Sequence, residues 1–182
     1  MKTIFFLQGP SGTGKSSALR DILTPHIRQT AGFTVQRLLE NGVTVGFRAI
    51  YLDGNALSFP SLEAVYTEDA DNIFILRGKW LGAEVLENML EKTLLRAQSP
   101  DIKMILLDEI GGIEMLSAKV METLEKILNT DKPCYGVLKS KENLERTIFK
   151  LGLSIHKEEL LEKHERLEKK ILPRSFLRGF KL

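Results

Sequence analysis

The chain has 182 residues, enough for one domain with a substantial core and too few for two domains of ordinary size. Hydrophobic residues make up 43% of it and charged residues 27%, a composition typical of a soluble globular protein. The net charge of +2 gives no overall attraction to a polyanion, so we expect no nucleic-acid partner. We therefore expect one domain over residues 1–182.

No stretch has the roughly 18 consecutive apolar residues of a membrane-spanning helix. The apolar run near the N-terminus is too short for a signal peptide. The single cysteine, Cys134, excludes an internal disulfide and suits a reducing compartment. We expect a cytoplasmic protein with no membrane role, in which Cys134 is a buried and unreactive thiol.

A glycine-rich loop near the N-terminus gives the first functional signal. Residues 9–16 read G-P-S-G-T-G-K-S and match the phosphate-binding pattern G-x-x-x-x-G-K-[S/T]. An apolar run at residues 3–7 predicts a buried strand before the loop, and helical spacing of apolar residues predicts a helix from about Lys15. Glycines let backbone N–H groups approach a polyphosphate, which the positive end of a helix also attracts. This context predicts a nucleoside triphosphate (NTP) site.

The loop also assigns roles to individual residues. Lys15 is expected to face solvent until nucleotide arrives and then to meet the β- and γ-phosphates, which makes it a catalytic candidate. The Ser16 hydroxyl is a ligand for Mg²⁺, the expected cofactor. The nucleotide-binding candidates are Gly9, Pro10, Ser11, Gly12, Thr13, Gly14, Lys15, Ser16 and Ser17.

After the first helix, which Ala31-Gly32 should close, the pattern changes to that of strands. Runs at 33–38 and 43–51 flank Asn41-Gly42, a pair typical of tight hairpins. A further strand is expected at 56–59, so residues 33–59 are interpreted as an antiparallel meander inserted after the first helix. Residues 61–72 are expected to form a loop.

The rest of the chain alternates between strand and helix patterns. Strands are expected at 73–76, 102–107 and 134–138, and helices at 83–97, at 116–128, at 141–150 and at 157–171. The alternation predicts an α/β fold with three layers and a mostly parallel sheet, interrupted by the meander. Residues from about 156 to 182 are expected to form a C-terminal helix and a basic tail. The five Lys and Arg from residue 169 onward indicate a solvated helix end rather than a nucleic-acid patch.

Two adjacent carboxylates follow the strand at 102–107. The carboxyl ends of parallel strands meet at one edge of a sheet, so Asp108 should face Ser16 across a Mg²⁺ ion. A second carboxylate there can orient and deprotonate a water molecule, which makes Glu109 the other catalytic candidate. Neighbours in a strand point to opposite faces, so we expect Glu109 to reach the site from the bend at Ile110-Gly111-Gly112. A loop cap for Asp108 and a surface acid for Glu109 are the alternatives.

Several of these segments resemble the cancer-related nucleoside-triphosphatase family. They are the phosphate loop, the string D-E-I-G-x-x-E at 108–114, the meander with A-G-F at 31–33 and G-F at 46–47, and G-K-W at 78–80. The resemblance runs to about residue 140. It implies a RecA-like P-loop fold with added antiparallel strands. It also implies slow hydrolysis of the terminal phosphate of ATP and GTP, and of CTP and UTP.

The chain departs from that family at Gly112-Ile113, where a bulkier residue and a methionine are usual, and at Lys139, where a histidine is frequent. Two other functions share the phosphate loop: a small-molecule kinase and a non-enzymatic NTP switch that acts on a partner. Arg77 and Arg146 are candidates for a cation that stabilises the transition state, and a protein partner or an oligomer could supply one instead.

Overall fold

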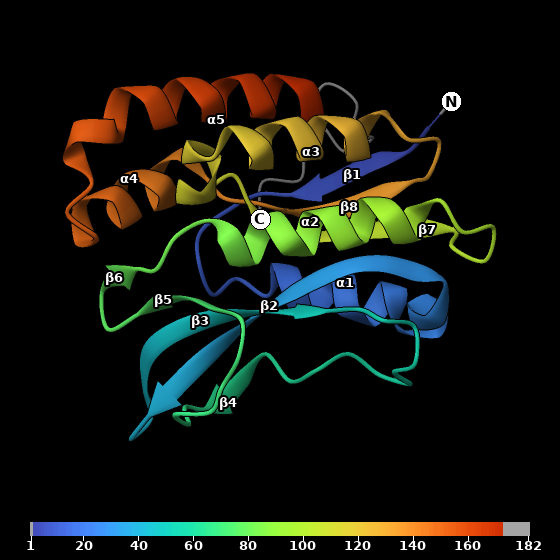
Figure 1. Ribbon diagram of the computed structural model, residues 1–182, viewed down its shortest axis with the longest axis horizontal. Coiled ribbons are helices and arrows are strands. Elements are labelled where there is room, and N and C mark those ends of the chain that lie inside the picture. The colour runs from blue at the N-terminus through green and yellow to red at the C-terminus, as the bar shows by residue number, and fades with distance from the viewer. Residues whose placement is uncertain (1, 173–182) are drawn as a thin grey trace.

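One mixed sheet organises the protein, of which the computed structural model describes residues 2–172 (Figure 1). The strand order is β1-β8-β7-β2-β3-β5-β6, and β4 pairs with β2 outside this path. Neighbours from β1 to β2 are parallel, whereas β3, β5 and β6 add antiparallel partners. The strands are β1 (Ile4–Leu7), β2 (Thr30–Glu40), β3 (Val43–Tyr51), β4 (Glu63–Val65), β5 (Ile73–Leu76), β6 (Lys79–Trp80), β7 (Met104–Ile110) and β8 (Cys134–Leu138).

Helices cover both faces of the sheet, so the predicted α/β class is confirmed. Helix α1 lies on one side and α2 and α3 lie on the other (Figure 1). The α-helices are α1 (Lys15–Leu23), α2 (Glu84–Ala97), α3 (Ala118–Asn129), α4 (Lys141–Lys150) and α5 (Lys157–Ile171). The described residues also contain three short 3₁₀ segments: η1 (Thr24–Gln29) between α1 and β2, η2 (Ile113–Leu116) between β7 and α3, and η3 (Ser154–His156) between α4 and α5.

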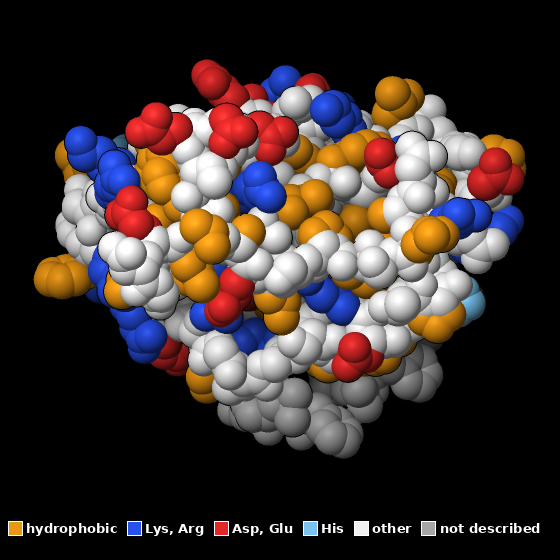
Figure 2. Space-filling model, turned by 90° about the horizontal axis from the view of Figure 1, so that it is seen from below, with side chains coloured by type: hydrophobic (Ala, Val, Ile, Leu, Met, Phe, Trp, Pro, Cys, Tyr) orange, Lys and Arg blue, Asp and Glu red, His pale blue; other side chains and the backbone are white. Residues whose placement is uncertain are grey.

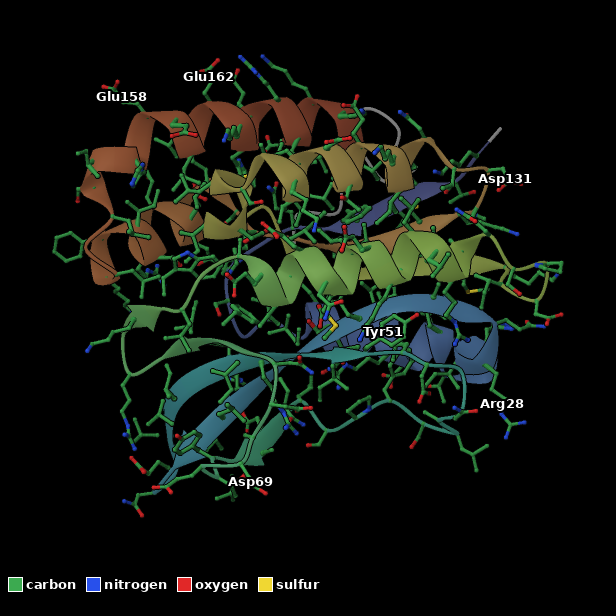
Figure 3. The ribbon with its side chains drawn as sticks, in the orientation of Figure 1. Arg28, Tyr51, Asp69, Asp131, Glu158 and Glu162 are labelled. Carbon is green, nitrogen blue, oxygen red and sulfur yellow. The ribbon has the colours of Figure 1, made fainter. Side chains whose placement is uncertain are left out.

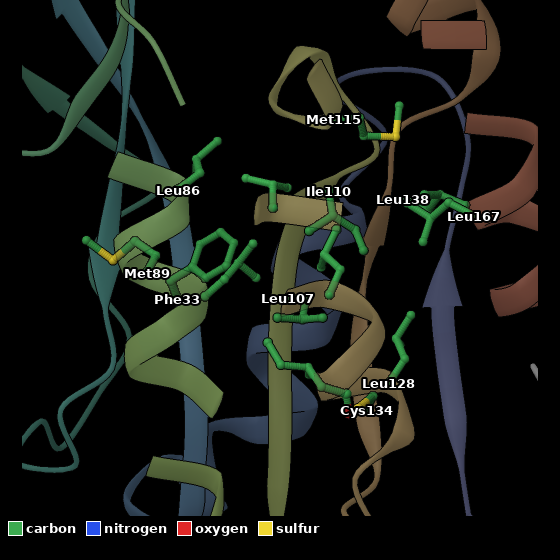
Figure 4. Close-up of a cluster of buried hydrophobic side chains, with 14 of the residues drawn as sticks. Phe33, Leu86, Met89, Leu107, Ile110, Met115, Leu128, Cys134, Leu138 and Leu167 are labelled. Atoms are coloured by element: carbon green, nitrogen blue, oxygen red, sulfur yellow. Dashed lines mark hydrogen bonds between the residues drawn. The ribbon is translucent and has the colours of Figure 1, made fainter. Parts of the chain in front are cut away.

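Alternation along the central strands divides the core in two. Leu106 packs with Leu19 and Leu23 of α1, whereas the next residue, Leu107, belongs to the larger core on the other face. Figure 4 shows that larger cluster between the sheet and the helices that cover it. Its Cys134 is fully buried, and burial raises the pKa of the thiol. The prediction of a buried thiol at Cys134 is therefore confirmed.

Strand β2 is longer than the sequence indicated and belongs to the main sheet. Ala31 and Gly32 do not close the first helix; they lie inside β2, paired in parallel with Ile105 and Leu106 of β7. The predicted hairpin at Asn41-Gly42 is confirmed, because both residues have positive φ and β2 pairs antiparallel with β3. The first residues of β2 are extended because they pair in parallel with β7. Strand propensity alone did not predict this extension.

Replacing Gly32 by alanine should destabilise the fold severely. Gly32 has φ +141°, and an added Cβ would lie 1.9 Å from the backbone oxygen of Leu106. Overpacking and a strained backbone together should lower the free energy of unfolding by about 3 kcal/mol or more. Gly152→Ala is the matched control, because Gly152 also has positive φ but an added Cβ meets open space. Urea denaturation of both variants checks this, and equal losses would contradict the crowding argument.

Three other expectations change. No strand forms at residues 56–59; instead β4 forms inside the predicted loop and pairs in parallel with β2 at Arg37–Leu39. The helix expected from residue 116 starts at Ala118, because the Ser117 hydroxyl accepts the N–H of Val120 and caps it. The strand expected to end at residue 107 continues to Ile110. The tail beyond residue 172 lies outside the described residues.

No helix among the described residues is long and apolar enough to cross a membrane. The face seen in Figure 2 mixes acidic and basic side chains, with apolar side chains scattered among them. The face in this view therefore shows no continuous patch of one charge, in keeping with the near-neutral composition.

Candidate functional site

The phosphate loop joins β1 to α1, as the motif required. Helix α1 begins at Lys15, and its cap residue Gly14 has φ +84°, in the left-handed region. Gly12 has φ +77°, and an added Cβ at either glycine would meet nothing within 4 Å. Backbone conformation rather than crowding therefore requires glycine here. The turn leaves the first N–H groups of α1 available to an anion.

Lys15 does not face solvent, and that expectation was wrong. Lys15 is only 6% exposed, because its side chain folds back over the phosphate loop. Nζ donates to the Pro10 carbonyl at 2.5 Å and to Thr13 Oγ1 at 3.3 Å. The charge is thus held at the loop that would surround the phosphates, where loop carbonyl and hydroxyl oxygens partly replace water.

Ser16 and Asp108 meet as the sequence predicted. Ser16 Oγ donates to Asp108 Oδ1 at 2.9 Å, although the two residues come from α1 and β7. The backbone N–H of Val35 in β2 donates to the other oxygen, Oδ2, at 3.0 Å. A hydroxyl and a carboxylate are hard oxygen ligands, and Mg²⁺ bound with phosphates needs only one or two such side chains. These residues fit a magnesium site.

Asp108 is only 3% exposed, and burial raises the pKa of its carboxyl to about 6. The Val35 N–H and the Ser16 hydroxyl act in the opposite direction, whereas the nearby charge of Glu109 raises the pKa further. A bound divalent cation would favour the ionised form. Without one, the buried charge costs stability.

Glu109 lies inside β7, not in the bend that follows it, and this corrects the sequence interpretation. The register between β7 and β8 shifts between Leu107 and Ile110, so the strand bulges at this pair. Glu109 itself has φ +56°, a conformation that costs a non-glycine residue about 1–3 kcal/mol. The bulge re-aims the side chain while Asp108 keeps facing α1. Such strain is concentrated at functional sites.

Lys139 lies beside Glu109 and also close to a buried glutamate, Glu114. Lys139 Nζ lies 3.8 Å from Glu109 Oε2. Glu114 is 5% exposed, its Oε1 accepts the Gly112 N–H at 2.9 Å, and burial raises the pKa of its carboxyl. Lys139 also acts electrostatically on Glu114. Lys139 thus lies close to the Glu109 and Glu114 carboxylates of the D-E-I-G-x-x-E string, whereas Asp108 faces α1.

Arg20 is a site residue that sequence reasoning missed. Four residues after Ser16 on α1, it faces the same way, is 8% exposed and acts electrostatically on Asp108. Its Nη1 donates to the Pro60 carbonyl, and its guanidinium lies 5.9 Å from the Phe59 ring centroid. Nε and Nη2 are buried without a hydrogen-bond partner among the described residues. The i, i+4 spacing from Ser16 was the signal that could have found it.

The two candidate arginines do not join this cluster. Arg77 sits in the turn between β5 and β6, 3.1 Å from Glu40 Oε1 and stacked on the Tyr66 ring. Arg146 is exposed on α4. Neither is in contact with Asp108, Glu109 or Lys15 in the described structure.

Two open hollows lie away from the phosphate loop, at the edge where the parallel strands begin. One, of about 280 Å³, is lined by Arg28, Asp53, Arg96 and Asp101 among others. The other follows η1. In Figure 3 Arg28 marks this end of the molecule. Ligands of open α/β sheets bind at the opposite edge, where β1 and β7 end.

Sequence comparison with known proteins identifies the family of this chain. A family model described as NTPase matches residues 4–172. The chain belongs to the NTPase family. Curated relatives carry the name nucleoside-triphosphatase THEP1. The one from Thermotoga sp. (strain RQ2) is 28% identical over 139 residues, which are 75% of this chain and 74% of the relative.

Two further relatives of the same name have comparable identity to this chain. That of Methanocaldococcus jannaschii is 26% identical over 146 residues, 73% of this chain and 76% of the relative. That of Saccharolobus solfataricus is 28% identical over 137 residues, which are 73% of this chain and 74% of the relative. A comparison with solved structures gives no significant match. The resemblance to the nucleoside-triphosphatase family and the prediction of an enzyme of this class are confirmed.

Proposed function

We propose that this protein hydrolyses NTPs to nucleoside diphosphate and phosphate with Mg²⁺, at the edge where β1, β7 and β8 end. The contact between Ser16 Oγ and Asp108 Oδ1, at 2.9 Å, carries the proposal. It joins the phosphate loop to a buried carboxylate, the combination that a metal-bound triphosphate requires. The names of the curated relatives support the same reaction.

Each residue has a separate task. Residues 9–17 surround the phosphates with backbone N–H groups, and Lys15 moves its ammonium from the Pro10 carbonyl to the β- and γ-phosphates. Ser16 and Asp108 hold the Mg²⁺ ion, which neutralises charge on the phosphate oxygens when bound. Glu109 holds a water molecule in line with the γ-phosphorus and accepts its proton.

The proposed substrate range follows from the parts of the nucleotide to which the proposed site residues would bind. Every residue to which we give a role would contact phosphate, metal or water and none would contact the base, so we propose that ATP, GTP, CTP and UTP are all hydrolysed. A preference above about a thousandfold for one base, ~4 kcal/mol, would contradict this proposal. Assaying the four nucleotides with a panel of hydroxyl acceptors also tests for a kinase, which would transfer the phosphate to an acceptor.

Lys15→Ala tests the phosphate loop directly. The variant loses the charge that meets the β- and γ-phosphates, so NTP affinity should fall by at least about tenfold, ~1.4 kcal/mol. Phosphate release should fall with it and should stop when Mg²⁺ is chelated. Lys150→Met, at the exposed end of α4, is the control and should change nothing. Unchanged turnover in a folded Lys15→Ala protein would show that this loop is not the site.

A further inference from the structure

Lys139 stands between the two halves of the proposed site. Strand β8 lies between β1 and β7 in the sheet. Its Val137 pairs with Leu7, the last residue of β1, and its Leu138 pairs with Ile110 beyond the acidic pair. Lys139 directly follows β8, at the level of Gly9 on one side and of Gly111, just past the acidic pair, on the other.

The backbone of Lys139 is fixed from three directions. Its N–H donates to the Ile110 carbonyl at 2.9 Å. Its carbonyl accepts Gln8 Nε2 at 3.2 Å and lies 2.6 Å from His164 Nε2. Gln8 directly precedes the phosphate loop, and His164 is a buried residue of α5. The base of this side chain is thus tied to the loop and to β7 together.

The Lys139 side chain extends past Gly112 toward the carboxylates of Glu109 and Glu114. Its stem passes so close to Gly112 that an added Cβ there would lie 3.0 Å from Lys139 Cε and 2.7 Å from Glu114 Oε2. The side chain is 25% exposed, and its ammonium reaches Glu109 Oε2 at 3.8 Å, which is longer than a direct hydrogen bond. A cation held loosely by one carboxylate, at the edge where phosphates bind, is free to take a second anion.

We propose that the Lys139 ammonium binds the γ-phosphate of the bound NTP and supplies from within the chain the cation that the transition state needs. This rests on the proposed function of the same site. Water attacks the γ-phosphorus, its proton passes to Glu109, and the bond to the β–γ bridging oxygen breaks toward the diphosphate. Lys139 transfers no proton; it neutralises charge on the γ-phosphoryl oxygens as the bond breaks.

Selectivity for triphosphate over diphosphate tests the proposal without any hydrolysis. Calorimetry with Mg²⁺ should compare ADP with an ATP analogue whose β–γ bridge is an imido group. In Lys139→Met, which keeps the stem over Gly112, affinity for the analogue should fall by tenfold or more while affinity for ADP stays within about threefold. Steady-state turnover should fall by roughly 10–100-fold. Lys139→Arg keeps the charge and should recover part of the affinity for the analogue and part of the turnover. Lys150→Met should alter neither quantity.

A second variant displaces the cation without removing it. Gly112→Ala crowds Lys139 Cε, so it should reduce the preference for the analogue by less than Lys139→Met does. Circular dichroism confirms that each variant is folded. An unchanged ratio of the two affinities in a folded Lys139→Met protein overturns the proposal, whatever its turnover. Failure of the wild-type protein to hydrolyse NTPs would instead overturn the proposed function, because the affinity ratio remains measurable.

Discussion

Glu109→Gln should leave Mg²⁺-dependent NTP binding near normal and slow hydrolysis by roughly 10²–10⁴-fold, the usual contribution of a general base. Glutamine keeps the size of the side chain and one acceptor oxygen but loses the basicity that takes the proton from water. The side chain is one-third exposed, so the substitution leaves no buried void. The bulged backbone at φ +56° is accessible to either residue at similar cost.

NTP binding and hydrolysis by Glu109→Gln need separate measurements. Nucleotide affinity is measured by calorimetry, and the chemical step by phosphate release in a single turnover. Glu158→Gln, on the exposed first turn of α5, is the matched control and should behave as wild type (Figure 3). Hydrolysis by Glu109→Gln within about threefold of wild type, under ~1 kcal/mol of barrier, would exclude the water-activating role. Glu114 would then be the next carboxylate to replace.

Asp108→Asn should produce two opposite effects: loss of Mg²⁺-dependent turnover and a more stable nucleotide-free protein. The amide cannot supply a charged ligand, so the Mg²⁺ concentration for half-maximal hydrolysis should rise by at least about tenfold. The stability gain has a separate cause. Burial raises the pKa of Asp108 from its ordinary 3.8 to about 6, so the folded state resists ionisation that the unfolded chain accepts.

The sign of this pH dependence is fixed by the raised pKa. Stability that Asp108 contributes when protonated is fully present below about pH 4 and is lost as the pH rises through about 6. Above pH 6 the loss amounts to roughly 3 kcal/mol, at about 1.36 kcal/mol per pKa unit. The hydrogen bond that asparagine cannot accept, from Val35 N–H or the Ser16 hydroxyl, reduces the gain by about 1 kcal/mol.

Urea denaturation without Mg²⁺ or nucleotide provides the measurement. The difference between Asp108→Asn and wild type should be larger at pH 8 than at pH 5 by about 1 kcal/mol. Asp131→Asn, at an exposed position shown in Figure 3, controls for the loss of one surface charge. A variant that is less stable than wild type at pH 8 would mean that the carboxylate's hydrogen bonds outweigh the cost of burying its charge.

The sequence by itself determined the α/β class and the phosphate loop. A strand, a glycine-rich turn and a helix are contiguous in the chain, so local patterns predict the segment from Ile4 to Leu23 that the structure contains. It also pointed to Asp108 opposite Ser16, because carboxyl ends of parallel strands share an edge. Both inferences rest on spacing along the chain and on a general rule of sheet topology.

Only the tertiary structure decided the rest. The inclusion of Ala31-Gly32 in β2 and the bulge at Glu109 depend on which strands lie side by side. The contact of Lys139 with Glu109 and that of Arg20 with Pro60 join residues 30 or more positions apart. Such contacts arise from sheet order and register, which hydrophobic spacing within one segment does not encode. The residues proposed to bind phosphate could therefore be identified along the chain, whereas Lys139, which we propose to contact the γ-phosphate, required the fold.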